Sequence, residues 1–305
     1  MEVNFELYKV FYHAAQKLSY TKAAEALFIS QSAVSQNIKL LEEQLDVQLF
    51  VRSGKGVKLT IEGEALYAHV EKAYNLLKSG EQYMDSIRSL SSGLVRIGAS
   101  DTINKYFLLD PLKTFHEKHP NIRIKINNRP SPVSLRLVES GEIDLGVINL
   151  DPEKSYSDLK IVPLGSFRNV FIAPIAWKND LEGLRSANSL SDHALISLEE
   201  KSTTRRIFDR YLLDNGLELS PEFEFGSMDL IVEMTRIGMG IGFVAQAAAQ
   251  SAIDAGEVFI LDIKEPIPTV EIGLISNPKI PMNLAAKAFS ETLLERISES
   301  YIMQS

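Results

Sequence analysis

The sequence lacks several features that would assign a protein to a whole class of function. It contains no cysteine, which excludes disulfide bonds, thiolate metal sites and cysteine nucleophiles. No run of 18 or more apolar residues occurs, so we expect no transmembrane helix and no membrane partner. The N-terminus has no basic segment leading into an apolar run, so we expect no secretory signal and a cytoplasmic location. No nucleophile elbow, P-loop or dinucleotide-binding fingerprint occurs, so we expect no cofactor and no catalytic residue.

The charge of the chain is unevenly distributed. The chain has 305 residues, enough for two or three compact units, and a formal net charge of −8. Residues 1–60 hold seven Lys or Arg and six Asp or Glu, whereas the rest of the chain holds 25 and 34. This asymmetry suggests that only the N-terminal part contacts nucleic acid.

Residues 21–45 have the pattern of two short helices joined by a tight turn. Thr21 is predicted to cap the first helix, and Ser30 or Ser32 the second. In the second helix the apolar residues recur at i, i+4, i+7 and i+11, on one face: Val34, Ile38, Leu41 and Leu45. The opposite face carries short hydroxyls, an amide and a cation, which suit the major groove of double-stranded DNA. An ordinary amphipathic helix with a solvated face would show the same pattern.

Two further elements complete a winged helix-turn-helix. Phe5 to about Leu18 is predicted to form a first helix, and residues 49–52 and 57–59 are strand-like runs around a Ser-Gly-Lys-Gly turn. The basic side chains of this hairpin would meet phosphates or the minor groove, although a solvated basic turn is the alternative. The candidate DNA contacts are Thr21, Ser30, Gln31, Ser32, Ser35, Gln36 and Lys39 in the helix pair, and Arg52, Lys55 and Lys58 in the hairpin.

The next segment predicts a long helix with a narrow apolar stripe. The stripe steps by four and three residues through Leu66, Val70, Ala73, Leu77, Gly80, Met84 and Ile87. A helix of about 28 residues would be about 42 Å long, so we expect its stripe to need a partner helix from a second copy. The resulting dimer would carry two recognition helices that read a two-fold symmetric site. The alternative is packing against the chain's own C-terminal domain.

Residues after 93 alternate between strand and helix patterns. Strands are predicted at 94–99, 122–126, 145–148, 170–173, 222–225, 241–244, 258–261 and 270–275, and helices at 103–118, 133–140, 203–215, 230–237 and 282–301. Such alternation predicts largely parallel sheets in two α/β subdomains. We expect no metal site, because His116 and His119 have no third ligand near them in the sequence.

Four strand-to-helix junctions place polar side chains where open α/β sheets bind ligands. Their candidate effector contacts are Ser100, Asp101, Thr102, Ser131, Ser202, Thr203, Thr204 and Ser227. Hydroxyls at helix N-termini that converge on one cleft would hold a small anion, whereas plain N-capping explains any single junction. Asp101 would select an amino or hydroxyl group on the ligand, or simply cap its helix.

Residues 5–60 resemble the DNA-binding signature of LysR-type transcriptional regulators. The resemblance is carried by the order A-A-E-A-L-x-I-S-Q-S-A-V-S-x-x-I-K-x-L-E-E-x-L-x-V-x-L-F-x-R followed by L-T. The position of Ser32 is often proline in that family, and the positions of Gln36 and Asn37 vary, so the operator sequence stays open. The resemblance also implies that the linker helix forms the dimer.

The C-terminal part resembles the effector-binding region of the same family, which is similar to periplasmic solute-binding proteins. Residues 139–147 and 226–243 carry the strongest match, although the family's proline after Gly242-Phe243 is absent. The resemblance implies effector contacts at Ser100, Thr102, Ser131, Thr203 and Thr204. The expected domains are 1–60, a linker helix 61–90, and an effector domain 91–305 with subdomains at about 91–164 with 269–305, and 165–268.

The sequence is thus interpreted as that of an α/β protein with an N-terminal winged helix-turn-helix, a long linker helix and a two-subdomain effector domain. We expect a non-enzymatic regulator that binds a dyad operator as a homodimer or homotetramer and responds to a small anion. RNA polymerase is a further candidate partner. The competing hypothesis is a small-molecule-binding α/β protein, or an enzyme, with a helical oligomerisation appendage.

Overall fold

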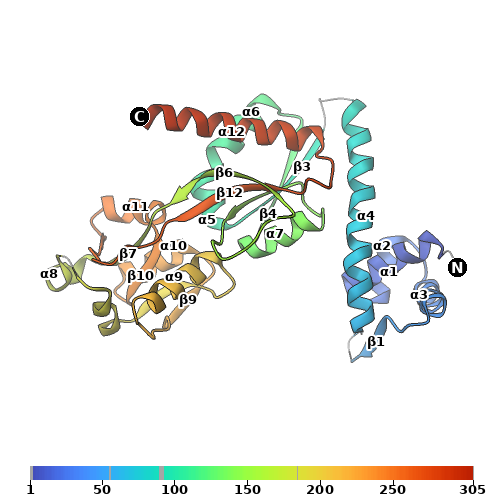
Figure 1. The fold of residues 1–305 in the computed structure, drawn as a ribbon, viewed down its shortest axis with the longest axis horizontal. Helices are drawn as coiled ribbons and strands as arrows, with labels where there is room; N and C mark the ends of the chain where they lie inside the picture. Colours follow the sequence, from blue (N-terminus) through green and yellow to red (C-terminus); the bar gives the residue numbers. More distant parts are fainter. Residues whose placement is uncertain (1–2, 55, 89–92, 184, 305) are drawn as a thin grey trace. The chain divides into compact units, whose positions relative to one another are not determined.

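The computed structural model describes residues 3–54, 56–88, 93–183 and 185–304. The chain divides into two compact units, Met1–Gln82 and Tyr83–Ser305, each with its own hydrophobic core. Figure 1 shows the N-terminal unit in blue and the elements of the C-terminal unit from green to red. The domain boundaries expected from the sequence stay a prediction.

The N-terminal unit is the predicted winged helix-turn-helix. It consists of helices α1 (Phe5–Lys17), α2 (Tyr20–Leu27) and α3 (Gln31–Leu45), strands β1 (Phe50–Ser53) and β2 (Gly56–Leu59), and the first part of α4 (Ile61–Arg88). The two strands form an antiparallel hairpin in which Phe50 pairs with Leu59 and Ser53 with Gly56. Gly56 is required there, because a Cβ at this position would lie 2.7 Å from the carbonyl oxygen of Leu18.

The first half of α4 completes the core of the N-terminal unit. Val70 is buried in the same cluster as Phe11, Ile38 and Leu41, and Leu66 packs against that cluster. Figure 1 shows α1 and α2 beside this half of α4. The prediction that the whole apolar stripe needs a partner helix is therefore wrong for Leu66 and Val70, because a three-helix unit cannot cover its own core without them.

The stripe is exposed farther along α4. Leu77 is 53% exposed and Met84 is 60% exposed, and they lie seven residues apart on the helix. The Ile87 side chain, the last predicted position of the stripe, lies outside the described residues.

The prediction of the helix caps is half right. Ser30 does cap α3, with its Oγ accepting from the Ala33 N–H at 3.1 Å. Thr21 does not cap α2; Ser19 does, by accepting from the Lys22 N–H at 3.3 Å. The reason is the backbone at the end of α1, where Leu18 adopts φ 45° and turns the chain, so that the cap falls two residues earlier than predicted.

The C-terminal unit contains two five-stranded sheets. The first has the order β4 (Ile122–Asn128), β3 (Gly93–Ala99), β5 (Leu145–Asn149), β12 (Val270–Ser276) and β6 (Lys160–Phe167). The second has the order β11 (Val258–Ile260), β7 (Asn169–Pro174), β10 (Ile241–Ala245), β8 (Leu195–Leu198) and β9 (Phe223–Phe225).

Both sheets are mixed, so the prediction of largely parallel sheets is wrong. In the first sheet β3 pairs in parallel with β4 and β5, whereas β12 is antiparallel to β5 and β6. In the second, β8 is parallel to β10 and β9, whereas β7 is antiparallel to its two neighbours. In each sheet, the strand that runs against both neighbours lies next to a crossing of the chain between the sheets: β7 is the first strand of the second sheet, and β12 returns to the first.

Helices cover both sheets. They are α5 (Asp101–Ile103), a π-helical segment (Asn104–Leu108), α6 (Leu109–Lys118), α7 (Ser131–Glu139), α8 (Lys178–Leu181), α9 (Thr203–Asp214), α10 (Met228–Arg236), α11 (Gln246–Asp254) and α12 (Leu284–Gln304), with 3-10 turns at Ile175–Trp177 and Ala187–Asp192. Helices α12 and α7 both pack on β3, and Figure 1 shows them on opposite sides of the first sheet. One core cluster includes residues of both sheets, such as Ile97 and Ile172.

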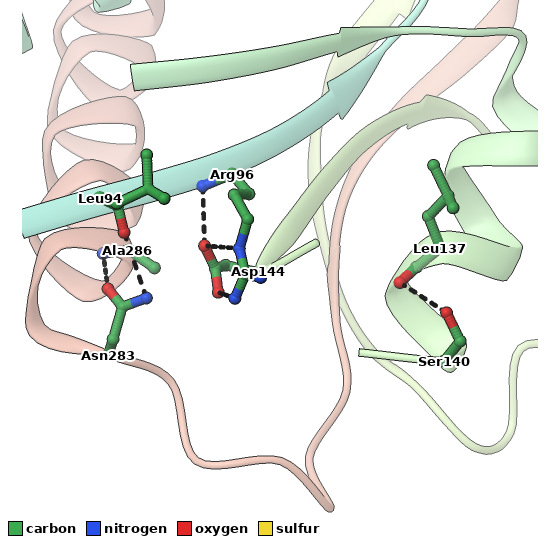
Figure 2. Close-up of polar contacts among 7 residues, drawn as sticks. All are labelled: Leu94, Arg96, Leu137, Ser140, Asp144, Asn283 and Ala286. Carbon is green, nitrogen blue, oxygen red and sulfur yellow. Dashed lines mark hydrogen bonds and ion pairs between the residues drawn. The ribbon is translucent and has the colours of Figure 1, made fainter. Parts of the chain in front are cut away.

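A largely buried ion pair joins β3 to the residue just before β5 in the first sheet. Figure 2 shows Arg96 of β3 against Asp144, with Nη2 donating to Oδ1 at 3.0 Å and the backbone N–H donating to Oδ2 at 2.7 Å. The two side chains are only 14% and 7% exposed. Nearby, Asn283 joins α12 to β3, because its Oδ1 accepts from the Ala286 N–H and its Nδ2 donates to the Leu94 carbonyl. Asp144 belongs to the segment 139–147 on which the resemblance to the family rests, and it thus has a structural role.

Candidate functional site

The first candidate site is the outward face of α3. Val34, Ile38 and Leu41 are buried, as the pattern predicts. The predicted contacts of the helix pair are all exposed: Thr21, Ser30, Gln31, Ser32, Ser35, Gln36 and Lys39. Lys39 pairs with Glu43 at 3.6 Å, one turn along the same helix, while both side chains stay largely in solvent. Helix α3 therefore presents a polar surface that plays no part in the core.

The polar groups of this face are mostly unused within the protein. In the described part of the chain, the side chains of Gln31, Ser35 and Gln36 make no hydrogen bond. Ser30 and Ser32 share a hydrogen bond between their hydroxyl oxygens at 2.9 Å, beside the cap of the helix. Donors and acceptors that are free and exposed can pair with base edges without first breaking an internal bond.

The hairpin carries its cations on different faces. Arg52 lies opposite Val57 and Lys58 lies opposite Val51, so the pleat directs the two exposed cations to opposite sides of the wing. Lys55, the third predicted contact, lies outside the described residues. A wing that enters a groove edge-on would bring one cation to each phosphate strand, whereas a wing lying flat would use only one.

A carboxylate that the sequence did not single out fixes the wing to α3. Glu42 Oε1 accepts from the backbone N–H groups of Leu49 at 2.7 Å and of Phe50 at 3.1 Å. It therefore satisfies two donors at the start of β1 and sets the distance between recognition helix and wing. The sequence did contain a signal for this role of Glu42. Of the two adjacent glutamates at positions 42 and 43, only the first lies toward the buried face of α3.

The second candidate site is a cavity of about 470 Å³ within the C-terminal unit. It lies at the carboxyl ends of β3, β4, β8 and β9, where the chain enters α5, α7, α9 and α10. Every predicted effector contact lines it: Ser100, Asp101, Thr102, Ser131, Ser202, Thr203, Thr204 and Ser227. The four junctions thus surround one cavity, and their role in binding an effector stays a prediction.

Some of these hydroxyls are helix caps, as the alternative to ligand binding supposes. Ser100 Oγ accepts from the Ile103 N–H at 3.4 Å, and Ser202 Oγ accepts from the Arg205 N–H at 3.0 Å. Ser227 precedes α10 without a capping bond, and its hydroxyl instead donates to Asp101 Oδ2 at 3.4 Å. The Thr102 side chain makes no hydrogen bond to any described residue.

A buried asparagine that the sequence patterns did not single out connects two walls of the cavity. Asn149, the last residue of β5, donates its backbone N–H to Ser131 Oγ at 3.0 Å. Its Nδ2 donates to Thr204 Oγ1 at 3.2 Å, so the first sheet is joined to α9. Its Oδ1 is buried and has no partner among the described residues. The available signal was its position at the carboxyl end of a strand, where ligand-binding side chains collect.

Charges around the cavity balance. Asp101 and Glu199 supply two carboxylates, and Arg129 and Lys201 supply two cations, all four on exposed side chains. The cavity therefore has no net formal charge, and the N-termini of α7, α9 and α10 contribute the remaining positive potential. Such a site suits a small molecule with an anionic end and a hydrogen-bond donor.

Two links outside the cavity lining join segments of the two sheets. Lys105 Nζ donates to Asp229 Oδ2 at 2.8 Å, and the Tyr106 hydroxyl donates to Asp229 Oδ1. Burial alone would raise the pKa of Asp229, but the bonds from Lys105 and Tyr106 lower it below the ordinary value. Arg206 of α9 makes the second link, with Nη2 2.9 Å from Asp151 Oδ2.

No three His, Cys, Asp or Glu residues group as metal ligands within the described ranges. Nor does any helix of the described ranges have both the length and the apolar content to cross a membrane.

Comparisons with known proteins match both units. Residues 5–64 match the family of bacterial regulatory helix-turn-helix proteins of the lysR type, and residues 88–298 match the LysR substrate binding domain. A probable RuBisCO transcriptional regulator of Trichormus variabilis is 27% identical over 284 residues, covering 92% of this chain and 84% of the relative.

Solved structures agree with this fold. A full-length OxyR variant from Pseudomonas aeruginosa superimposes with a TM-score of 0.70 at 21% identity, covering 96% of this chain and 95% of the other. The effector binding domain of QuiR in complex with shikimate matches with a TM-score of 0.59 at 16% identity, covering 68% of this chain and 98% of that one.

Proposed function

This chain belongs to the LysR family of transcriptional regulators, which are not enzymes, and from that premise we propose how it recognises DNA and effector. It binds a two-fold symmetric operator as a homodimer or homotetramer, acting in the cytoplasm. A small anionic effector in the cavity changes the spacing of the DNA-binding units. RNA polymerase is a further proposed partner.

One observation carries the proposal for DNA. The outward face of α3 bears exposed hydroxyls and amides, of which Gln31, Ser35 and Gln36 make no hydrogen bond within the described part of the chain, while the apolar residues of the opposite face are buried or half-buried. A helix built this way can lie in the major groove with its backbone close to the bases. Arg52 and Lys58 on the wing supply phosphate contacts beside it.

Self-association is supported by the second half of α4. Leu77 and Met84 are exposed and lie on one side of the helix, seven residues apart. Burying them against the same residues of a second copy removes apolar surface from water. A dimer then places two α3 helices at a fixed separation, which a two-fold symmetric operator can match.

The anionic effector is supported by the chemistry of the cavity. Helix N-termini and unbonded hydroxyl groups such as that of Thr102 favour a carboxylate or phosphate. QuiR's effector domain holds shikimate, a hydroxylated carboxylic acid. The effector must bind one arrangement of the regulatory domains better than another, because equal affinity would shift no equilibrium.

The test removes one amide from α3. Gln36→Ala is expected to weaken operator binding by about 5- to 150-fold, equivalent to about 1–3 kcal/mol, without changing the unfolding temperature. Footprinting on DNA that the protein retains from its own genome measures the affinity. Gln250→Ala is the matched control, because Gln250 is exposed on α11, outside the DNA-binding unit. An unchanged footprint for Gln36→Ala would contradict the proposed role of α3.

A further inference from the structure

The turn between α2 and α3 exposes one aromatic ring. Phe28 is 96% exposed, more than any other large hydrophobic residue in the described part of the chain. Its backbone lies in the left-handed region, at φ 56° and ψ 39°. Its N–H donates to the carbonyl groups of Ala24 and Glu25, which ends α2.

Folding gives no reason for a phenylalanine at this position. A bulky side chain disfavours the left-handed backbone, which glycine or asparagine adopts more easily at the end of a helix. The ring is also absent from the hydrophobic core that α1, α2 and α3 form. Phe28 therefore costs stability through its backbone conformation, and its ring contributes nothing to the core in return, which points to a contact outside the chain.

The neighbours of the ring indicate what it contacts. Phe28 lies two residues before Ser30, the N-cap of α3, and the exposed residues that follow are Ser30, Gln31 and Ser32. The N-terminal end of a recognition helix is the part that reaches base edges in the major groove. The apolar group displayed in that groove is the C5-methyl group of thymine, for which phenylalanine is a suitable partner.

We propose that Phe28 packs against the C5-methyl group of a thymine in each half of the operator and so selects thymine at that position. This inference rests on the DNA-binding function proposed above. A protein partner is disfavoured because one ring flanked by serine and glutamine side chains is far smaller than a specific protein interface.

The test uses operator duplexes in which single thymines are replaced by deoxyuridine, which lacks only the methyl group. For the full-length wild-type protein, replacement at one position in each half-site is expected to weaken binding by about fourfold per methyl group. Phe28→Asn keeps the left-handed turn and is expected to bind the thymine duplex about as weakly as wild type binds the deoxyuridine duplex. It should then not distinguish the two duplexes.

Leu18→Asn is the matched control, because Leu18 is also an exposed hydrophobic residue with a positive φ, at the end of α1. It should keep the sensitivity to deoxyuridine. The dependence of binding on salt should be the same for wild type and Phe28→Asn, because no charge is removed.

The outcomes separate this inference from the proposed function. If wild type binds an operator and yet loses no more affinity than Phe28→Asn when any thymine is replaced by deoxyuridine, the thymine contact is overturned and DNA binding stands. If Phe28→Asn loses self-association with unchanged DNA affinity, the ring contacts protein and the inference is also overturned. If wild type prefers no DNA sequence, the proposed function itself fails.

Discussion

The recognition face of α3 and the cavity of the C-terminal unit hold their polar side chains in opposite ways. On α3 the amides and most hydroxyls are exposed and form few bonds within the protein. In the cavity, Ser131 and Thr204 accept from the buried Asn149, and Ser100 and Ser202 cap helices. A substitution on α3 should therefore alter binding alone, whereas many substitutions in the cavity should alter stability as well.

The two regions also differ in how many segments build them. The α3 face comes from one helix, so its geometry is set by local sequence. The cavity needs four strand-to-helix junctions and β5, brought together by two sheets. The contrast predicts that damage to the sheets should abolish the cavity and leave the α3 face unaffected.

The largest expected effect comes from the ion pair that holds the first sheet. Asp144→Asn leaves Arg96 buried without its counter-charge, so the free energy of unfolding of the C-terminal unit should fall by about 3–5 kcal/mol. Urea unfolding followed by the fluorescence of the single tryptophan, Trp177, measures it. Glu295→Gln breaks an exposed pair with Lys118 and should cost at most about 1 kcal/mol. If the free energy of unfolding fell equally in the two variants, the buried pair would contribute no more to stability than the exposed one.

A smaller effect is expected from two substitutions in the cavity, one of which should weaken ligand binding and the other stability. Thr203→Val removes a hydroxyl that lines the cavity and should weaken binding of a small anion by about fivefold, without altering basal DNA affinity. Calorimetry measures this with whichever carboxylate or phosphate compound most raises the unfolding temperature of wild type. Thr204→Val should lower stability more, because the buried Nδ2 of Asn149 loses its acceptor, whereas the Thr203 hydroxyl accepts from Arg206, whose side chain is 39% exposed. Unchanged anion affinity in Thr203→Val would exclude that hydroxyl from the site.

The salt dependence of DNA binding tests the cations of the N-terminal unit. Lys39→Ala and Arg52→Ala should each reduce the slope of log affinity against log salt by about 0.9 for every phosphate that the missing cation had neutralised. The stability of Lys39→Ala should hardly change, because among the described residues Lys39 pairs only with the exposed Glu43. Binding isotherms between low and moderate salt give the slope. Lys118→Ala, in the C-terminal unit, should leave the slope as in wild type; a similar reduction there would mean that the C-terminal unit also meets DNA.

The smallest expected effect is a dependence of the stability of the N-terminal unit on pH. Burial, and then the charges of Lys78, Lys17 and Lys9, lower the pKa of His13 below its ordinary value of 6.5. The unfolded chain therefore binds the proton more readily, so stability is full above about pH 6.5 and decreases as the pH falls toward the folded pKa. The unfolding temperature of wild type should decrease from pH 8 to pH 5, and this decrease should be smaller for His13→Gln. Identical pH profiles for the two proteins would rule out His13 as its source.

Local pattern was enough to predict α3, because buried and exposed positions alternate on a single helix. It was not enough for the start of α2, where the backbone of Leu18 decides which residue caps. Strand β6 was missed because it contains Pro163 and Gly165, which indicate turns in a sequence but are tolerated in an edge strand. Strand direction in the two sheets depends on where the chain crosses between them, which no local pattern records.

The cavity shows the same limit. Its hydroxyls were predictable, since each follows a strand and opens a helix. The bond from Asn149 to Thr204 and the Lys105–Asp229 link were not predictable, because the bonded residues lie 55 and 124 positions apart in the sequence. Bonds between such distant residues arise only once both sheets have formed.

The most direct test of DNA reading by α3 is to sequence the DNA fragments that the full-length protein retains from its own genome. We expect enrichment of a two-fold symmetric sequence whose half-sites are separated by whole turns of about 10 base pairs. Gln36→Ala should lose the preference at matching positions in both halves. Retention of fragments with no common sequence, or of a single asymmetric site, would contradict the claim that paired α3 helices read base pairs.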